Sequence, residues 1–207
     1  MVKIIGICGF SGSGKSYYSN KLKRNYKNSI ILSTDRYYKT VPPNVADYNF
    51  DDPEAIDFCL LIYHLHRLKN GASVNLPNYN FNTHSRESFI TTINPITTIN
   101  PITTINPITT IILEGIFILC IEKLRELIDE LIFIDTSEEI SLSRRIDRDI
   151  KERGREKLEI IRYHSKFVKP SQDKYIKPFI KYCNIKINND RFIENNEVNE
   201  ENNLYLY

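Results

Sequence analysis

The chain has 207 residues, of which 41% are hydrophobic and 26% are charged, and its formal net charge is +2. This length allows one domain with a hydrophobic core, and the composition is typical of a soluble globular protein. The nearly balanced charge argues against a surface built for nucleic acid or an anionic membrane. No apolar run reaches the ~20 residues of a membrane span. Four scattered cysteines without a CxxC pair favour reduced thiols, so we expect a cytoplasmic protein.

Apolar runs and helical patterns alternate along the chain. Short runs rich in β-branched residues predict strands at 2–8, 29–33, 111–113, 131–134 and 183–187. Helical spacing with glycine or proline stops predicts helices at 15–28, 53–69, 136–154 and 157–168. The third helix is expected to begin with a capping box of Thr136 and Glu139, and the fourth to stop before Pro170. The alternation predicts an α/β fold with a mostly parallel sheet, which binds ligands at the carboxyl ends of its strands.

Two segments depart from this pattern. The hexapeptide Ile-Asn-Pro-Ile-Thr-Thr occurs three times within 93–110, and a proline in every copy excludes a central strand. We expect a repeat-expanded surface hairpin or edge loop at 91–110, inside a single domain that spans 1–187; a partner-binding or aggregation segment is the alternative. The Asn- and Glu-rich segment 188–207 is expected to be a disordered tail.

Residues 9–16, Gly-Phe-Ser-Gly-Ser-Gly-Lys-Ser, match the phosphate-binding P-loop pattern in full, between a predicted strand and a predicted helix. Glycines allow backbone N–H groups to surround phosphate oxygens, and the helix N-terminus adds positive charge. Lys15 should reach the β- and γ-phosphates of ATP or GTP, and the Ser16 hydroxyl should ligate Mg²⁺. The nucleotide-binding residues expected here are Gly9, Ser11, Gly12, Ser13, Gly14, Lys15, Ser16 and Tyr17. A glycine-rich turn without a ligand is the weaker alternative.

Acidic residues follow two of the other predicted strands. Asp35 comes after the second strand, where its carboxylate could accept the proton of an acceptor hydroxyl. A turn or helix-cap aspartate is an equal alternative from this residue alone. Glu114 comes after the third strand, where an acid can hold Mg²⁺ through water.

Further motifs occur in a fixed order and make the chain resemble the uridine–cytidine kinases over roughly residues 3–187. Besides the P-loop, they are the segments 35–38, 49–57, 77–86, 112–116, 144–155, 167–170 and 175–178. The resemblance implies a P-loop NTPase-type parallel sheet flanked by helices, with a β-hairpin and a helical lid. It implies transfer of the γ-phosphate of ATP or GTP, with Mg²⁺, to the 5′-hydroxyl of uridine or cytidine. It also implies a homo-oligomer, often a tetramer.

The resemblance implies roles for individual side chains. Asp35 would deprotonate the nucleoside 5′-hydroxyl, Asp51 would bind the ribose 2′- and 3′-hydroxyls, and Glu114 would help to hold Mg²⁺. Arg148 and Arg153 would close on the phosphates as lid arginines. Aromatic walls, base-reading groups and substrate-contacting arginines of the nucleoside pocket would be Tyr38, Phe50, Tyr79, His84, Arg145 and Arg155.

Structural alternatives exist for most of these residues. Asp51 could cap a helix at Pro53, Tyr38 and Phe50 could be core residues, and His84 could be a solvated loop residue. The charges at 147–153 have the spacing of ion pairs on a solvated helix face: Asp147 with Lys151, Asp149 with Arg153, and Arg148 with Glu152.

Some residues depart from the family pattern. Arg162 stands where the family usually places a glutamine that contacts the base, and Asn80 replaces an acid. A related P-loop kinase acting on nicotinamide riboside, pantothenate or phosphoribulose is one alternative, against which the segment 79–86 argues. A catalytically inert nucleotide-binding protein is another, against which the intact Lys15, Ser16, Asp35 and Glu114 argue.

Overall fold

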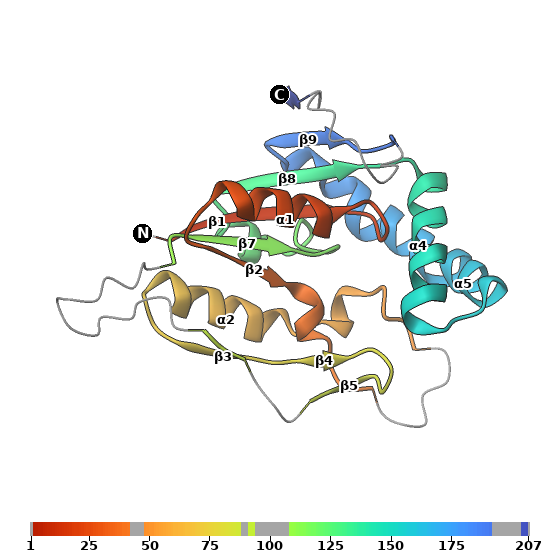
Figure 1. The fold of residues 1–207 in the computed structure, drawn as a ribbon, viewed down its shortest axis with the longest axis horizontal. Helices are drawn as coiled ribbons and strands as arrows, with labels where there is room; N and C mark the ends of the chain where they lie inside the picture. Colours follow the sequence, from red (N-terminus) through yellow and green to blue (C-terminus); the bar gives the residue numbers. More distant parts are fainter. Residues whose placement is uncertain (1, 42–47, 88–90, 94–107, 192–203, 207) are drawn as a thin grey trace.

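The computed structural model describes residues 2–41, 48–87, 91–93, 108–191 and 204–206. A six-stranded sheet in the order β10-β9-β8-β1-β7-β2 forms its centre (Figure 1). Five neighbouring strands run parallel: β1 (Lys3–Gly9), β2 (Ser29–Ser33), β7 (Thr110–Glu114), β8 (Glu130–Asp135) and β9 (Ile185–Asn188). β10 (Leu204–Leu206) adds an antiparallel edge beside β9. The predicted α/β fold with a mostly parallel sheet is therefore confirmed.

Apolar residues on both faces of the sheet are buried under helices. In β1, Ile5 and Ile7 belong to a cluster with Tyr18 of α1 (Lys15–Asn25). The alternate residues Ile4 and Cys8 belong to a second cluster with residues of α2 (Phe58–Lys69) and α3 (Glu122–Arg125). Successive side chains of a strand point to opposite faces, so a strand covered on both faces is apolar throughout.

Two further helices lie beyond the carboxyl ends of the strands. They are α4 (Glu138–Arg153) and α5 (Lys157–Tyr163), at the right of Figure 1. Gly154 joins them in the left-handed conformation, with φ of 62°, which glycine adopts without strain. On another side, below α2 in Figure 1, β3 (Val74–Leu76) pairs with β6 (Thr91–Ile93), and β4 (Tyr79–Asn80) pairs with β5 (Ser85–Arg86). A hairpin and helices beyond the sheet are thus present as the resemblance implies, whereas the role of α4 and α5 as a lid stays a prediction.

The single helix predicted at 53–69 is wrong. A 3₁₀ turn, η2 (Pro53–Ala55), comes first, and α2 begins only at Phe58. Ile56 between them has an extended backbone. The Asp57 side chain accepts a hydrogen bond from the Leu60 N–H at 3.0 Å, so a new helix N-terminus forms there.

The predicted capping box at the start of α4 is also wrong. The N-cap is Ser137, and no side-chain cap bond forms there. The Thr136 hydroxyl instead donates to the Ser13 carbonyl of the P-loop at 3.1 Å. The Ser137 N–H donates to the Asp190 carboxylate, which thereby takes over the capping. The other predicted end of this helix, near Gly154, agrees with the structure.

The helix predicted to stop before Pro170 continues past it. After α5 the chain runs through η3 (His164–Val168), α6 (Lys169–Ser171), η4 (Gln172–Ile176) and the 3₁₀ segment η5 (Lys177–Tyr182). η3 and η4 are π-helical. The wider turns on both sides accommodate a proline that has no N–H to donate.

The two unusual segments are only partly described. Thr91–Ile93 is strand β6, whereas residues 94–107, which hold most of the hexapeptide repeat, lie outside the described part of the chain. Of the predicted tail, Asn189 and Asp190 make side-chain contacts with the domain, and β10 extends the sheet, which differs from the expected disorder. No helix among the described residues combines the length and the apolar character that crossing a bilayer requires.

Candidate active site

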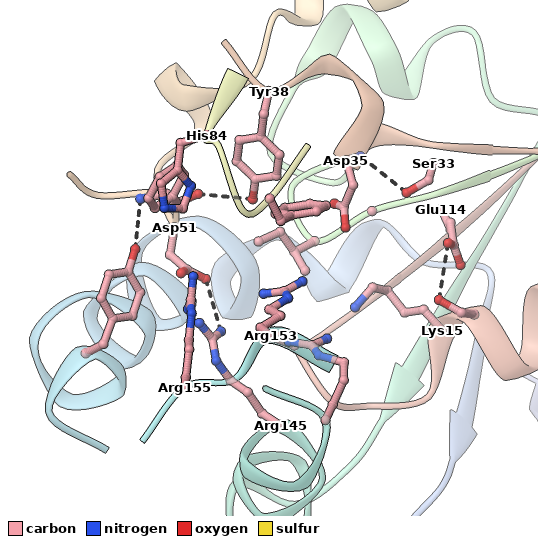
Figure 2. A pocket seen from close by; sticks show the side chains of 18 residues that line it. Lys15, Ser33, Asp35, Tyr38, Asp51, His84, Glu114, Arg145, Arg153 and Arg155 are labelled. Carbon is pink, nitrogen blue, oxygen red and sulfur yellow. Dashed lines mark hydrogen bonds and ion pairs between the residues drawn. The ribbon is translucent and has the colours of Figure 1, made fainter. Parts of the chain in front are cut away.

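A pocket lies at the carboxyl ends of β1, β2 and β7, between the sheet and α4 (Figure 2). The predicted site residues that line it are Ser11, Lys15, Ser16, Asp35, Tyr38, Phe50, Asp51, His84, Glu114, Arg145, Arg148, Arg153 and Arg155. Segments that are far apart in the sequence thus converge where a parallel sheet binds its ligands. Gly9, Gly12, Ser13, Gly14, Tyr17 and Tyr79 are not among the lining residues.

The P-loop has the backbone that its glycines allow. Gly12 and Gly14 have φ of 87° and 95°, in the left-handed region. A Cβ at Gly12 would stand 2.1 Å from the Ser141 carbonyl oxygen of α4, so the loop and this helix approach too closely for any side chain. Gly12 and Gly14 thus serve the shape of the loop and need not line the pocket.

Two buried side chains donate hydrogen bonds to the backbone of the P-loop. The Ser13 carbonyl accepts a hydrogen bond from Asn189 Nδ2 at 2.7 Å and one from the Thr136 hydroxyl at 3.1 Å. These donors follow β9 and β8, so the sheet itself fixes the loop. The functional residue Asn189 was missed because it belongs to the segment that the sequence analysis assigned to the tail.

Lys15 is half-buried, lines the pocket and donates hydrogen bonds to its own loop. Its ammonium donates to the carbonyl oxygens of Phe10 at 2.9 Å and Gly9 at 3.2 Å. Burial lowers the pKa of Lys15, and the nearby Glu114 and Asp35 oppose this change. A phosphate group placed beside Lys15 would add negative charge that favours the charged form of this lysine.

Ser16 and Glu114 offer oxygen atoms for a magnesium ion. The Ser16 hydroxyl donates to Glu114 Oε1 at 3.2 Å, and the buried Ser19 hydroxyl donates to Oε2 at 2.9 Å. Mg²⁺ prefers oxygen ligands and usually takes one or two from the protein, with phosphates and water completing the shell. The described residues contain no group of three or more His, Cys, Asp or Glu that could hold a metal alone. The residues therefore fit Mg²⁺ bound together with a nucleotide.

Asp35 lies in the 3₁₀ turn η1 (Thr34–Tyr37) directly after β2. Its backbone N–H donates to the Ser33 hydroxyl at 3.2 Å, and Figure 2 shows its side chain in the pocket with Lys15. Burial raises the pKa of Asp35, and Lys15 and Arg153 oppose the rise. A carboxylate with a raised pKa is a stronger base than an exposed aspartate.

Arg86 fixes the turn that carries Asp35. Its guanidinium donates to the carbonyl oxygens of Tyr38 at 3.0 Å and Tyr37 at 3.1 Å, and to the Asp57 carboxylate at 3.2 Å. Asp57 is also the N-cap of α2. Arg86 thus joins the β4–β5 hairpin to the turn that positions Asp35 and Tyr38.

Aromatic rings form one end of the pocket. Tyr38 and Phe50 lie with ring centroids 6.1 Å apart, and the Phe50 and His84 rings are 4.7 Å apart in a tilted arrangement. Tyr38 also donates its hydroxyl proton to the Phe50 carbonyl at 3.1 Å. Phe81, a residue of the motif at 77–86 for which the sequence predicts no role, lines the same end. Tyr79 lies behind it, packed on Tyr38 and Phe81.

His84 has an unusual backbone, with φ of 50°. Burial and the nearby Arg155 and Arg153 lower the pKa of His84, which favours the neutral form of the ring. Its Nδ1 atom is buried and makes no hydrogen bond within the described structure. A neutral imidazole nitrogen in the pocket can donate or accept one bond to a ligand.

Asp51 faces the pocket rather than capping a helix. Asp51 is 6% exposed, and its carboxylate lies 3.6 Å from the Arg145 guanidinium. The cap of η2 is the neighbouring Asp52, which accepts from the Glu54 N–H at 2.9 Å. The structure thereby excludes the helix-cap role that the sequence left open for Asp51.

The two arginines expected in a lid and the two expected to contact the substrate form one arginine cluster on and just after α4: Arg145, Arg148, Arg153 and Arg155 (Figure 2 labels three of them). Each lies within 4 Å of the Asp149 carboxylate. Asp149 has no exposed surface, so its predicted ion pair with Arg153 forms in the interior and not on a solvated face. Arg148 also approaches the Ser11 hydroxyl of the P-loop at 3.5 Å.

Several expectations refer to residues outside the pocket wall. Tyr17 is 46% exposed and packs edge-on against Tyr18. Arg162 is exposed, whereas the adjacent Tyr163 lines the pocket and accepts a hydrogen bond from the Phe50 N–H at 2.9 Å. The remaining lining residues that sequence reasoning gave no role are Ser33, Gly115 and Ile116.

Comparison with known proteins assigns the chain to a family. The model of the phosphoribulokinase/uridine kinase family matches residues 4–194. The chain is 38% identical over 192 residues to the uridine kinase of Schizosaccharomyces pombe, and 39% identical over 186 residues to uridine-cytidine kinase A of Dictyostelium discoideum. These matches cover 89% and 88% of this chain but only 40% and 35% of the relatives. The uridine kinase of Borrelia duttonii, 37% identical over 190 residues, is matched over 90% of this chain and 86% of its own length.

Solved structures agree on the fold. The phosphoribulokinase from Rhodobacter spheroides has a TM-score of 0.61 at 14% identity, covering 90% of this chain and 70% of that one. The D-glycerate 3-kinase from Cryptococcus neoformans has a TM-score of 0.65 at 14% identity, covering 90% and 85%. From the match to its model over nearly the whole domain, this chain belongs to the phosphoribulokinase/uridine kinase family.

Proposed function

We propose that this protein transfers the γ-phosphate of ATP to the 5′-hydroxyl of uridine or cytidine and releases UMP or CMP. The observation that carries the proposal is the placement of Asp35 between Lys15 of the P-loop and an aromatic pocket that holds a second carboxylate, Asp51. Curated relatives at 37–39% identity carry the names uridine kinase and uridine-cytidine kinase.

The donor side of the pocket suits the phosphates of a nucleoside triphosphate. The P-loop backbone would surround them, and Lys15 with the arginine cluster would neutralise the charge that develops on the transferred group. Ser16 directly, and Glu114 through water, would hold Mg²⁺. The ion would add positive charge at the β- and γ-phosphates when the donor is bound.

The acceptor side suits a ribose. Asp35 would accept the proton of the 5′-hydroxyl as its oxygen forms a bond to the γ-phosphorus and the bond to the bridging oxygen of ADP breaks. Asp51 would accept hydrogen bonds from the 2′- and 3′-hydroxyls, since one carboxylate can accept two donors. The raised pKa of Asp35 favours this proton transfer.

The far end of the pocket suits a planar base. Phe50, Tyr38 and Phe81 provide aromatic surface, and the unpaired nitrogen of His84 provides a polar contact. A phosphorylated sugar such as phosphoribulose, or the flexible chain of pantothenate, would leave this aromatic surface without a matching ring. These features favour a nucleoside acceptor over phosphoribulose or pantothenate.

The setting of the enzyme belongs to the same proposal. All four cysteines are free, which suits the cytoplasm. The resemblance to uridine–cytidine kinases suggests a homo-oligomer, and the proposed partners are small molecules rather than nucleic acid or membrane.

A panel of acceptors tests the function. ADP release would be followed with ATP and Mg²⁺ for uridine, cytidine, adenosine, thymidine, nicotinamide riboside, pantothenate and ribulose 5-phosphate, and products would be identified by mass. Turnover of uridine, cytidine or both, with little on the others, is expected. Turnover of another acceptor with silence on both pyrimidines would overturn the proposal.

A further inference from the structure

We propose that Asp149 is a positioning residue that holds the arginine cluster over the transfer site and, through Arg145, couples the acceptor pocket to the donor pocket. The inference deepens the proposed function and rests on it. The sequence alone gives no hint of it, because the spacing of Asp149 and Arg153 is that of an ordinary pair on a helix surface.

The Asp149 carboxylate is the common anion of four cations. Its Oδ1 atom lies 2.8 Å from Arg148 Nη2 and 3.4 Å from Arg153 Nη1. Its Oδ2 atom lies 3.6 Å from Arg155 Nη1 and 3.7 Å from Arg145 Nε. Asp149 itself has no exposed surface, and every one of these arginines lines the pocket.

The backbone of Asp149 also organises the turn that returns the last arginine. Its carbonyl oxygen accepts hydrogen bonds from the N–H groups of Gly154 and Arg155, the latter at 3.1 Å. Because Gly154 takes the left-handed conformation, the chain reverses there, and Arg155 reaches back to the Asp149 carboxylate. The side chain of Asp149 thus contacts all four arginines, and its main chain fixes the turn that carries Arg155.

The charges around Asp149 do not balance. In these ion pairs four guanidinium groups share two carboxylates, Asp149 and Asp51, so positive charges outnumber negative ones within the arginine cluster. Like charges at such distances repel strongly in a partly buried site. Without Asp149, we expect the arginines to move apart, so that none keeps the position that a transferred phosphate requires.

Arg145 connects Asp149 with the acceptor pocket. It lies 3.6 Å from Asp51 on one side and 3.7 Å from Asp149 on the other, and it is 5% exposed. Its Nε atom and Asp149 Oδ2 are both buried without a hydrogen bond in the described structure. The distance between Arg145 Nε and Asp149 Oδ2 can therefore shorten until a hydrogen bond forms. A ribose that binds Asp51 would draw the carboxylate away from Arg145, which is then free to close on Asp149.

The other side of Asp149 reaches the donor pocket. Arg148 lies between Asp149 and the P-loop hydroxyl of Ser11, at 2.9 Å from Asp149 (Nε to Oδ1) and 3.5 Å from Ser11. Binding of the acceptor at Asp51 would thus be transmitted through Arg145, Asp149 and Arg148 to the phosphate site. The expected effect is that the nucleoside tightens the binding of the triphosphate.

The test compares Asp149→Asn with Asp147→Asn, which removes the same charge from an exposed position two residues away on α4. Asp149→Asn should lower kcat about 10²-fold, the effect of misplacing catalytic groups by about 1 Å. It should not weaken the binding of a non-hydrolysable ATP analogue, because the variant has one more net positive charge. Asp147→Asn should keep the wild-type kcat. A merely structural defect would weaken both quantities, and a kcat within threefold of the wild type in Asp149→Asn would overturn the proposal.

The coupling is measured as the ratio of the analogue's dissociation constants without and with uridine. In the wild type and Asp147→Asn this ratio should be about 5 or more, and in Asp149→Asn about 1. If Asp149→Asn does not fold, Arg145→Gln carries the same test, because Asp149 keeps three arginine partners in that variant. Its ratio should also be about 1. A wild-type ratio of 1, or an unchanged ratio in the variant, would overturn the coupling.

Failure of the proposed function would be recognised separately. It would be seen in the wild type, which would then phosphorylate neither uridine nor cytidine. The wild type and Asp149→Asn would then be compared by their rates of ATP hydrolysis without an acceptor, a reaction that uses the same arginines. Asp149→Asn should lower that rate at least tenfold, and an unchanged rate would overturn the role of Asp149.

Discussion

The Ser16 hydroxyl donates a hydrogen bond to the Glu114 carboxylate over 3.2 Å, although 98 positions separate them in the sequence. β1 and β7 are parallel neighbours, and Ile7 pairs with Glu114. The P-loop and the acid therefore meet at one end of the sheet. Ser19 occupies the other carboxylate oxygen at 2.9 Å, which fixes the orientation of Glu114.

Glu114→Gln should raise the Mg²⁺ concentration needed for half-maximal activity by about 10–100-fold, the usual effect of removing a charged group that supports a bound metal. Binding of ATP without Mg²⁺ should change little. The measurement is a magnesium titration of activity and of nucleotide binding, with Glu122→Gln at an exposed position of α3 as the control. Identical titration curves for wild type and Glu114→Gln would contradict the assignment.

Asp35→Asn should lower kcat about 10²–10⁴-fold, the range for a general base. Burial raises the pKa of Asp35, and only the deprotonated group can accept a proton. In the wild type, kcat should therefore fall on the acid side with a pKa above that of an exposed aspartate, and this acid limb should be missing from the residual activity of Asp35→Asn. A pH–rate profile checks it, and an unchanged limb in the variant would remove Asp35 from the base role.

The raised pKa of Asp35 also predicts that Asp35→Asn, which lowers activity, increases the stability of the fold at neutral pH. Because the pKa of Asp35 is higher in the folded than in the unfolded protein, its proton stabilises the fold at low pH. That contribution is lost as pH rises through the folded pKa. At neutral pH, Asp35→Asn should raise the melting temperature, by about 2–4 °C for each kcal/mol gained, and the difference should shrink in acid. A lower melting temperature of Asp35→Asn at neutral pH would contradict a raised pKa of Asp35 in the folded protein.

Two glycines with positive φ should respond differently to alanine. Gly12→Ala places a methyl group 2.1 Å from the Ser141 carbonyl oxygen, whereas a Cβ at Gly154 meets no atom within 4 Å. Gly154→Ala should therefore cost only the left-handed strain of about 1–2 kcal/mol, while Gly12→Ala should abolish nucleotide binding. Thermal unfolding and ATP-binding measurements would separate them, and equal effects would contradict the close approach of loop and helix.

Asn189→Ala should weaken ATP binding severalfold and lower the free energy of unfolding by about 0.5–1.5 kcal/mol, the usual contribution of one hydrogen bond. The reason is that Asn189 donates a 2.7 Å hydrogen bond to the Ser13 carbonyl. In the variant this carbonyl keeps only the hydrogen bond from Thr136 of these two. Asn188→Ala, at an exposed neighbouring position, is the control. If both variants bind ATP equally well, Asn189 has no part in shaping the loop.

The sequence predicted those parts of the site that depend on short stretches of consecutive residues. The P-loop lies within eight consecutive residues, and Asp35 and Glu114 each follow a short apolar run that marks a buried strand. Period and composition alone are enough to place such residues at one edge of a parallel sheet.

The parts that the sequence did not predict depend on contacts between distant residues. Asn189 bonds to a residue 176 positions away. Three acids stand close together at Asp51, Asp52 and Asp57, and only the packing decides which of them caps a helix and which faces Arg145. The charge spacing around Asp149 suits an exposed helix face equally well, because spacing does not reveal burial.

The most direct test of the central claim follows the label of [γ-³²P]ATP in the presence of uridine or cytidine, with 5′-deoxyuridine as the acceptor that lacks the reacting hydroxyl. The wild type should yield labelled UMP or CMP, 5′-deoxyuridine should yield no labelled nucleotide, and Asp35→Asn should transfer label about 10²–10⁴-fold more slowly. Label found only in inorganic phosphate, or transfer that is unchanged in Asp35→Asn, would contradict the central claim.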